Sequence, residues 1–147
     1  MRENTRRTKS ELPPIHVTGD EMRRLRTLAN SNMDLFPRIV NFLARELDRA
    51  IVVKDDDDLR GVVRMGSQVC YRDENTGEVR DLVLVYPHEA DMYGRISVLT
   101  PLGAALIGLS VGQAIEYQTP GYETGKLTVL RVSPQEEGIR PNARQPV

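Results

Sequence analysis

The stretch from Ile96 to Gly112, which reads ISVLTPLGAALIGLSVG, constrains the fold of this chain more than any other stretch. At its start, Ile96 and Val98 alternate with Ser97 and Leu99, a pattern typical of a short and mostly buried strand. The stretch is therefore expected to begin in the core of a sheet.

A short helix is expected to follow this strand. Thr100 can cap the helix with its side-chain oxygen, and Pro101 occupies the first helical position, where its missing N–H costs nothing. Gly108 can adopt the left-handed conformation that ends a helix, and Gly112 is expected to form the next turn. Because the helical residues are small or aliphatic, the helix can lie close against a sheet. This predicts a sheet-based domain in which the helix is a connector.

The N-terminal part predicts two helices joined by a polar Asn-Ser-Asn turn. Thr18 and Glu21 have the spacing of a capping box, at the start of a helix over about residues 20–29. Asp34 is expected to cap a second helix, which has Pro37 in its first turn. The second helix has apolar residues at amphipathic spacing, namely Phe36, Ile39, Val40, Leu43, Leu47 and Ala50. The two apolar stripes are expected to bury each other in a short antiparallel hairpin.

The acidic run from Asp55 to Asp58 separates this hairpin from the rest of the chain. Four consecutive carboxylates repel one another, so we expect an exposed linker. The run lacks the alternating ligands and the final Glu of a calcium loop, so we expect no metal site. The predicted organisation is a disordered leader (1–14), the hairpin (15–53), the linker (54–65), a sheet domain (66–133) and a disordered tail (134–147).

Beyond the linker the hydrophobic pattern changes from helical to alternating. Strands are expected around Val69 and Tyr71 and over residues 79–86, 114–118 and 126–132, with a turn at Gly77. The sequence thus predicts an α+β fold, in which an antiparallel sheet wraps against the Pro101–Gly108 helix.

Composition limits the possible partners. The hydrophobic fraction of 39% supports a core, but no apolar run approaches the roughly 20 residues that span a bilayer, so we expect no membrane contact. The N-terminus lacks the apolar segment of a secretory signal and Cys70 has no cysteine to pair with, so we expect a cytoplasmic protein. The formal net charge is −1, and we expect no sequence-specific contact with nucleic acid.

Charge is distributed unevenly between the two halves. Residues 1–50 have ten Lys and Arg against seven Asp and Glu, a balance of +3, whereas residues 66–133 have five against eight, a balance of −3. Two ordinary solvated surfaces explain this difference, and a role in orienting an unevenly charged partner is the alternative.

No catalytic residues stand out. His16 and His88 lie in different parts of the chain, and neither has a Cys or His at metal-ligand spacing. Ser97 and Ser110 lack the context of an activated nucleophile, and no glycine-rich phosphate loop is present. We therefore expect no enzymatic activity and no cofactor.

Several phrases in a fixed order show a family resemblance. The chain resembles the C-terminal domain of the Gre transcription elongation factors in segments that occur in the same order. These segments are EAD within YPHEADMYGRIS, then ISVLTP, a small-residue helix, VGQ and a Thr-Pro-Gly turn. Together with the N-terminal helices, residues 15–132 look most like the regulators of nucleoside diphosphate kinase. The resemblance implies an FKBP-like fold for the C-terminal domain and RNA polymerase as a partner.

Comparison with the resembling families also indicates two activities that this chain is expected to lack. Gre factors are described as reaching down the secondary channel of RNA polymerase with a long coiled coil, whose acidic tip holds the metal for transcript cleavage. Here the first helix has only about three turns, and the tip has Asn32 and one acid, Asp34, so no cleavage is expected. An FKBP-like fold also suggests prolyl isomerisation, which needs an aromatic-lined pocket. Both Phe residues belong to the N-terminal helices, so we expect no isomerase activity.

Two functions remain open. In the first, the sheet domain docks on RNA polymerase near the secondary channel, and the expected docking residues are His88, Glu89, Asp91, Ser97, Thr100, Pro101 and Leu102. A role of Thr100, Pro101 and Leu102 in capping and packing their helix is an equal alternative, and both roles are compatible. In the second function, the chain regulates nucleoside diphosphate kinase, either by direct contact or indirectly through transcription.

Overall fold

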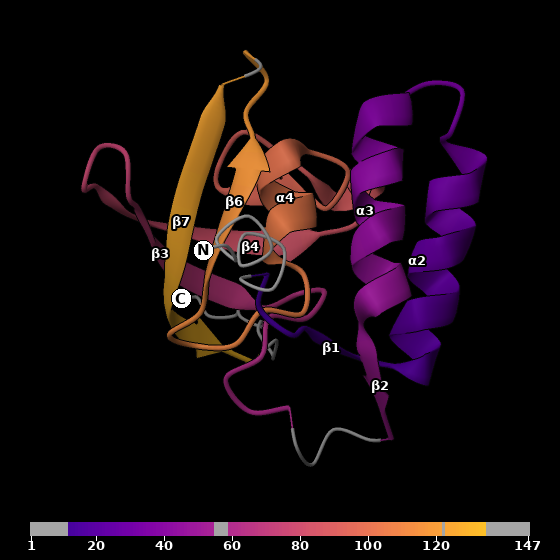
Figure 1. Ribbon diagram of the computed structural model, residues 1–147, viewed down its shortest axis with the longest axis horizontal. Helices are drawn as coiled ribbons and strands as arrows, with labels where there is room; N and C mark the ends of the chain where they lie inside the picture. The colour runs from indigo at the N-terminus through magenta and orange to yellow at the C-terminus, as the bar shows by residue number, and fades with distance from the viewer. Residues whose placement is uncertain (1–11, 55–58, 122, 135–147) are drawn as a thin grey trace, which may run out of the picture.

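A helical hairpin stands beside a curled five-stranded sheet in the computed structural model, which describes residues 12–54, 59–121 and 123–134 (Figure 1). The elements in chain order are β1 (His16–Thr18), α2 (Gly19–Ser31), α3 (Pro37–Arg49), β2 (Ile51–Val53), β3 (Gln68–Asp73), β4 (Val79–Val85), the 3₁₀-helix η2 (Pro87–Glu89), β5 (Arg95–Ser97), α4 (Pro101–Leu106), β6 (Ala114–Gln118) and β7 (Thr124–Ser133). The α+β prediction is confirmed.

The two helices of the hairpin begin in different ways. At α2 the predicted capping box is present, because Glu21 N donates to Thr18 Oγ1 at 3.1 Å and Thr18 N donates to Glu21 Oε1 at 3.3 Å. At α3 the predicted cap is wrong. The N-cap residue is Phe36 rather than Asp34, and no side chain caps this end. Pro37 starts the helix instead, because its fixed φ is already helical.

The buried stripe of α3 is shorter than expected. Val40, Leu43 and Leu47 are buried, as predicted, but Phe36 is 44% exposed and lies at the hairpin tip. The stripe therefore begins one turn later than the sequence pattern indicated.

Two three-residue strands lie at the base of the hairpin, and their pairing was not predicted. β1 and β2 pair in parallel, with Ile51 N donating to Ile15 O at 2.8 Å. On its other side, His16 N donates to Gly108 O at 3.0 Å, which links the hairpin to the sheet domain. Strands of this length are too short for their alternation to be recognised in sequence.

The five-stranded sheet has the order β5-β4-β3-β7-β6. The pairings of β3 with β4, β3 with β7 and β6 with β7 are antiparallel, as predicted. The exception is β5, which pairs with β4 in parallel because the intervening loop crosses back along the sheet. β5 also ends at Ser97, earlier than expected, although Val98 and Leu99 beyond it are buried.

Helix α4 packs against the sheet domain at very close range. A Cβ atom at Gly103 would lie 2.1 Å from Ser97 O, so only glycine fits there. Thr100 caps the helix by accepting a hydrogen bond from Gly103 N at 3.0 Å, as predicted. Gly108 has the predicted left-handed conformation, with φ of +84°.

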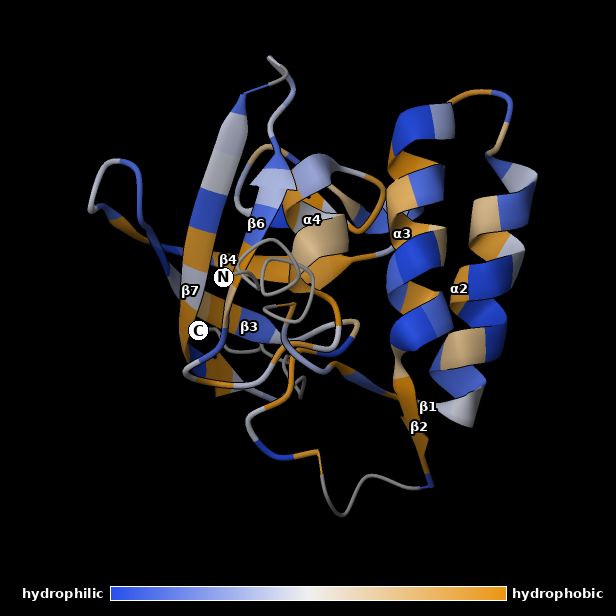
Figure 2. Ribbon diagram, viewed as in Figure 1, coloured by the Kyte–Doolittle hydropathy of each residue, from blue (hydrophilic) through white to orange (hydrophobic). Residues whose placement is uncertain are grey.

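Hairpin and sheet share one hydrophobic core. Its members include Leu25 and Leu43 from the hairpin as well as Leu84 and Val129 from the sheet. Figure 2 shows apolar segments interspersed with polar ones along both helices of the hairpin, and an apolar stretch at β2. The hairpin is therefore part of the globular body.

The segment that follows the acidic run also contributes to this core. Leu59 and Val63 are buried, and Val63 N donates to Leu109 O at 2.7 Å. Residues 59–65 were assigned to the acidic linker, but Leu59, Val62 and Val63 in this segment are buried. The run Asp55–Asp58 itself lies outside the described residues.

Candidate partner-binding surface

The loop between β4 and β5 contains three of the predicted docking residues, and two of them stabilise the loop itself. Asp91 Oδ1 accepts hydrogen bonds from Tyr93 N at 2.8 Å and Arg95 N at 3.3 Å, and Asp91 Oδ2 lies 3.7 Å from Arg95 Nε. Glu89 Oε1 accepts from Tyr86 N at 3.4 Å. The two carboxylates hold the conformation of the loop.

This conformation projects two apolar side chains that were not among the predicted docking residues. Met92 is 83% exposed and Tyr93 is 84% exposed. Exposed apolar side chains of this size are typical of contact sites when they lie together on a loop. The run Asp-Met-Tyr-Gly inside a polar loop was the available signal for them.

The predicted residues near α4 have a capping role. Ser97 Oγ accepts from Leu99 N at 2.9 Å, and Thr100 Oγ1 donates to Ser97 O at 2.7 Å. Thr100, Pro101 and Leu102 are each only partly exposed. Their capping and packing role is present, and it leaves part of each side chain accessible to a partner.

The tip of the hairpin is apolar. Asn32 is held locally, since its Nδ2 donates to Leu28 O at 2.9 Å, and Asp34 is exposed. Around them Met33 is 41% exposed, Leu35 71% and Phe36 44%. A tip of this composition suits contact with an apolar protein surface better than coordination of a hard cation, which needs several oxygen ligands.

Two grooves flank the hairpin. The α2 groove, of about 740 Å³, lies between α2 and the start of the β4–β5 loop and is lined by Arg23, Arg24, Thr27, Leu28, Ser31, Asn32, Tyr86, Pro87 and His88. It brings His88 together with the hairpin-tip residue Asn32, although the sequence placed them in separate parts. The rings of His88 and Tyr86 stack with centroids 6.4 Å apart. Burial raises the pKa of Tyr86, and the nearby Arg24 guanidinium opposes this shift.

The α3 groove, of about 700 Å³, lies between α3 and the end of β6, with Pro101 also lining it. Its lining includes Phe36, Phe42 and Tyr117. Phe36 and Phe42 come from the N-terminal hairpin, as the sequence placed them, and they share this groove with Tyr117 of β6 because α3 packs beside the sheet domain. Glu89, Asp91, Ser97, Thr100 and Leu102 line neither groove.

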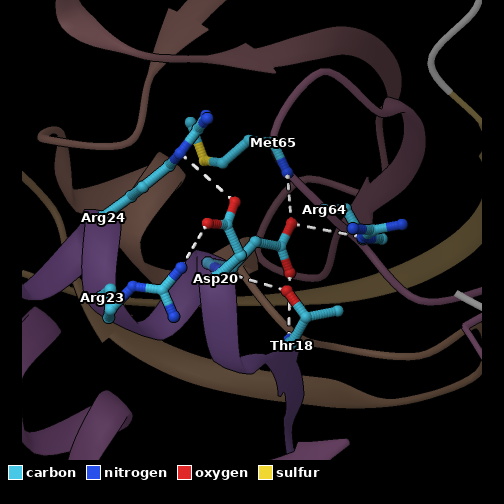
Figure 3. A network of polar contacts seen from close by, with 7 residues as sticks. Thr18, Asp20, Arg23, Arg24, Arg64 and Met65 are labelled. Carbon is cyan, nitrogen blue, oxygen red and sulfur yellow. Dashed lines mark hydrogen bonds and ion pairs between the residues drawn. The ribbon is translucent and has the colours of Figure 1, made fainter. Parts of the chain in front are cut away.

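A polar network fixes the orientation of α2. Glu21 is buried, and its Oε2 lies 3.2 Å from Arg64 Nε and 3.4 Å from Met65 N, in the segment before β3. Figure 3 shows this network, in which Asp20 also contacts Arg23 at 2.7 Å and Arg24 at 3.3 Å. Glu21, the second residue of the α2 capping box, therefore also joins the hairpin to the sheet domain.

Within the described ranges, no cluster of three or more His, Cys, Asp or Glu residues could hold a metal ion. Cys70 is buried in β3. None of the described helices is both long and apolar enough to cross a membrane.

Comparison with known proteins supports the resemblance found in the sequence. Residues 54–134 match the family described as transcription elongation factor, GreA/GreB, C-term, and residues 13–53 match the Rnk N-terminus. The chain is 41% identical over 100 residues to the regulator of nucleoside diphosphate kinase of Escherichia coli, which covers 67% of this chain and 74% of that protein.

Two elongation factors are also similar. The transcription elongation factor GreA of Syntrophobacter fumaroxidans is 43% identical over 79 residues, which is 53% of this chain and 51% of that protein. The solved prokaryotic transcription elongation factor GreA/GreB from Nitrosomonas europaea superposes with a TM-score of 0.65 at 35% identity, over 83% of this chain and 99% of that chain. These relatives are named as regulators or elongation factors and not as enzymes.

Proposed function

The chain belongs to the GreA/GreB transcription elongation factor family, and we propose that it is a non-enzymatic regulator that binds RNA polymerase near the secondary channel and modulates elongation without transcript cleavage. The family assignment supports a transcription-factor-like regulator. The apolar tip, with Asp34 as its one carboxylate, is the observation that supports binding without cleavage.

Docking is best tested at the loop that projects Met92 and Tyr93. The wild-type protein should displace a labelled Gre factor from RNA polymerase, because both would contact the same rim of the channel. The double variant Met92→Ser with Tyr93→Ser should displace it less well, because its exposed apolar contact is removed. Val79→Thr is the matched control, since Val79 is also exposed but lies away from this loop, on β4.

The docking proposal is wrong if the wild-type protein displaces no Gre factor at high micromolar concentration. Equal displacement by the wild type and the double variant would place the contact elsewhere on the domain.

Transcript cleavage gives an independent test. Stalled elongation complexes should show no magnesium-dependent shortening of the nascent RNA when the protein is added, because a single carboxylate cannot hold the metal beside a phosphate. Shortening that disappears in an Asp34→Ala variant would contradict the proposed lack of cleavage.

A second candidate function is regulation of nucleoside diphosphate kinase, by direct contact or through transcription. It is favoured by the 41% identity to a protein named as regulator of that kinase. Sedimentation of the purified chain mixed with the purified kinase, and separately with polymerase, distinguishes the two partners. A complex with the kinase alone would favour this second function.

A further inference from the structure

The α3 groove is built by two distant parts of the chain. One wall is formed by the N-cap residue Phe36 and by residues of α3 as far as Arg45, and the other is the end of β6 with the turn that follows it, Tyr117 to Pro120. Arg38 Nη2 donates to Gln118 Oε1, which joins the two walls. Figure 1 shows that α3 is the helix of the hairpin that faces α4 and the sheet.

The lining combines apolar rings with positive charge. Among the described residues that line the groove, three are aromatic and three are proline, Arg38 and Arg45 add positive charge, and none is Asp or Glu. A ligand with both apolar and anionic groups is complementary to such a surface.

The spacing of the two arginines narrows the kind of ligand. Arg38 and Arg45 are seven residues apart on one helix, which separates them by about 10 Å along its axis at ~1.5 Å per residue. The charges of a nucleoside diphosphate are concentrated at one end, so such a ligand would engage one arginine at a time. The carboxylates of a protein segment are spread along its length and can engage both.

The small number of basic residues argues against single-stranded nucleic acid. Binding to a polyphosphate backbone depends on several Lys and Arg side chains along the path of the strand. Among the described residues, two arginines and no lysine line the groove.

We propose that the α3 groove binds an acidic protein segment that has bulky apolar side chains. The apolar side chains would lie against Phe36, Phe42 and Tyr117, and the carboxylates would pair with Arg38 and Arg45. This groove does not include Glu89, Asp91, Met92 or Tyr93, so its function does not depend on polymerase docking through the β4–β5 loop.

The test uses a fluorescein-labelled peptide that alternates Glu with Leu and Phe, added to the protein of residues 1–147 and followed by fluorescence anisotropy. Arg45→Glu should weaken binding by about tenfold or more, because one charge-assisted contact becomes a repulsion. Phe36→Ala should also weaken binding without unfolding the chain, since Phe36 is partly exposed. Arg131→Glu is the matched control, because Arg131 is exposed on β7 and outside the groove.

Three comparison ligands test whether the groove prefers an acidic protein segment to a basic peptide, a nucleic acid or a nucleotide. The same peptide with Lys in place of Glu should bind at least about tenfold more weakly, and oligothymidylate and ADP should not compete. Competition by oligothymidylate or ADP that is lost in Arg45→Glu would overturn the proposal in favour of a nucleic-acid or nucleotide site. Equal peptide affinity of the wild type and Arg45→Glu, or no peptide binding, would overturn it as well.

Discussion

The two ends of the helical hairpin differ in what holds them. At the base, β1 lies between β2 and Gly108, and buried Glu21 binds the segment before β3. At the tip, the turn is held by local bonds such as Leu35 N to Asn32 O at 3.1 Å, and apolar side chains face outward. Buried contacts at the base fix the direction of the hairpin, and the tip remains available to a partner.

The comparison shows that the stability of the fold and the binding of a partner depend on different ends of the hairpin. Burial of apolar area and pairing of buried polar groups stabilise the fold, whereas exposed apolar groups contribute little to it and can contribute to binding. Substitutions at the base are therefore expected to change stability, and substitutions at the tip are expected to change partner binding.

The largest expected effect comes from two identical substitutions at opposite ends of the hairpin. Leu47 is 1% exposed near the base, and Leu35 is 71% exposed at the tip. Leu47→Ala should lower the free energy of unfolding by about 3 kcal/mol, because it leaves a cavity in the core. Leu35→Ala should change the free energy of unfolding by less than about 0.5 kcal/mol. Urea unfolding measures both, and equal losses would contradict the separation of the two ends.

A smaller effect on stability is expected from substituting two acidic residues, one at each end of the hairpin. Glu21→Ala should cost about 2 kcal/mol, because it leaves Met65 N and Thr18 N without their acceptor and removes an ion pair to the partly exposed Arg64. Asp34→Ala should leave the urea midpoint unchanged, since Asp34 is exposed. Glu21→Gln is the control that keeps an acceptor and removes the charge, so it should lose less stability than Glu21→Ala.

The smallest effect concerns alkaline pH and three tyrosines that are wholly or partly buried. Burial raises the pKa of Tyr71, Tyr86 and Tyr117 above that of the unfolded chain. The folded state then holds these protons more tightly, so its stability is complete below pH ~10, the pKa of an unperturbed tyrosine, and falls as pH rises through the folded values. The urea midpoint should decline above that pH, and a Tyr86→Phe variant should decline less steeply. A midpoint that rises with pH would contradict this assignment.

Local chemistry made several features predictable from sequence. The Thr18–Glu21 capping box, the Thr100 cap, Pro101 at the start of α4 and the left-handed Gly108 all depend on residues close together in the chain. For the same reason, the hairpin and the strands of the sheet could be recognised from periodicity, although their ends shifted by a few residues. The family resemblance could also be recognised, because its phrases occur in order along the sequence.

The surfaces proposed to bind partners were harder to predict from the sequence. Phe36 fits the apolar stripe of α3 by spacing, yet it is exposed because the buried stripe starts at the next turn, where α3 packs in the core. The docking residues were chosen because they lie in this loop and at the start of α4, but Asp91 and Glu89 are engaged within their own loop, and Met92 and Tyr93 project instead.

The amino-acid sequence by itself determined the local elements, because capping, turn formation and periodic burial are properties of neighbouring residues. The tertiary structure decided which of those elements meet. Glu21 binds Arg64, β1 pairs with β2, and Phe42 faces the same groove as Tyr117. Each of these pairs is far apart in sequence and becomes adjacent only when the apolar faces of hairpin and sheet are buried in one core.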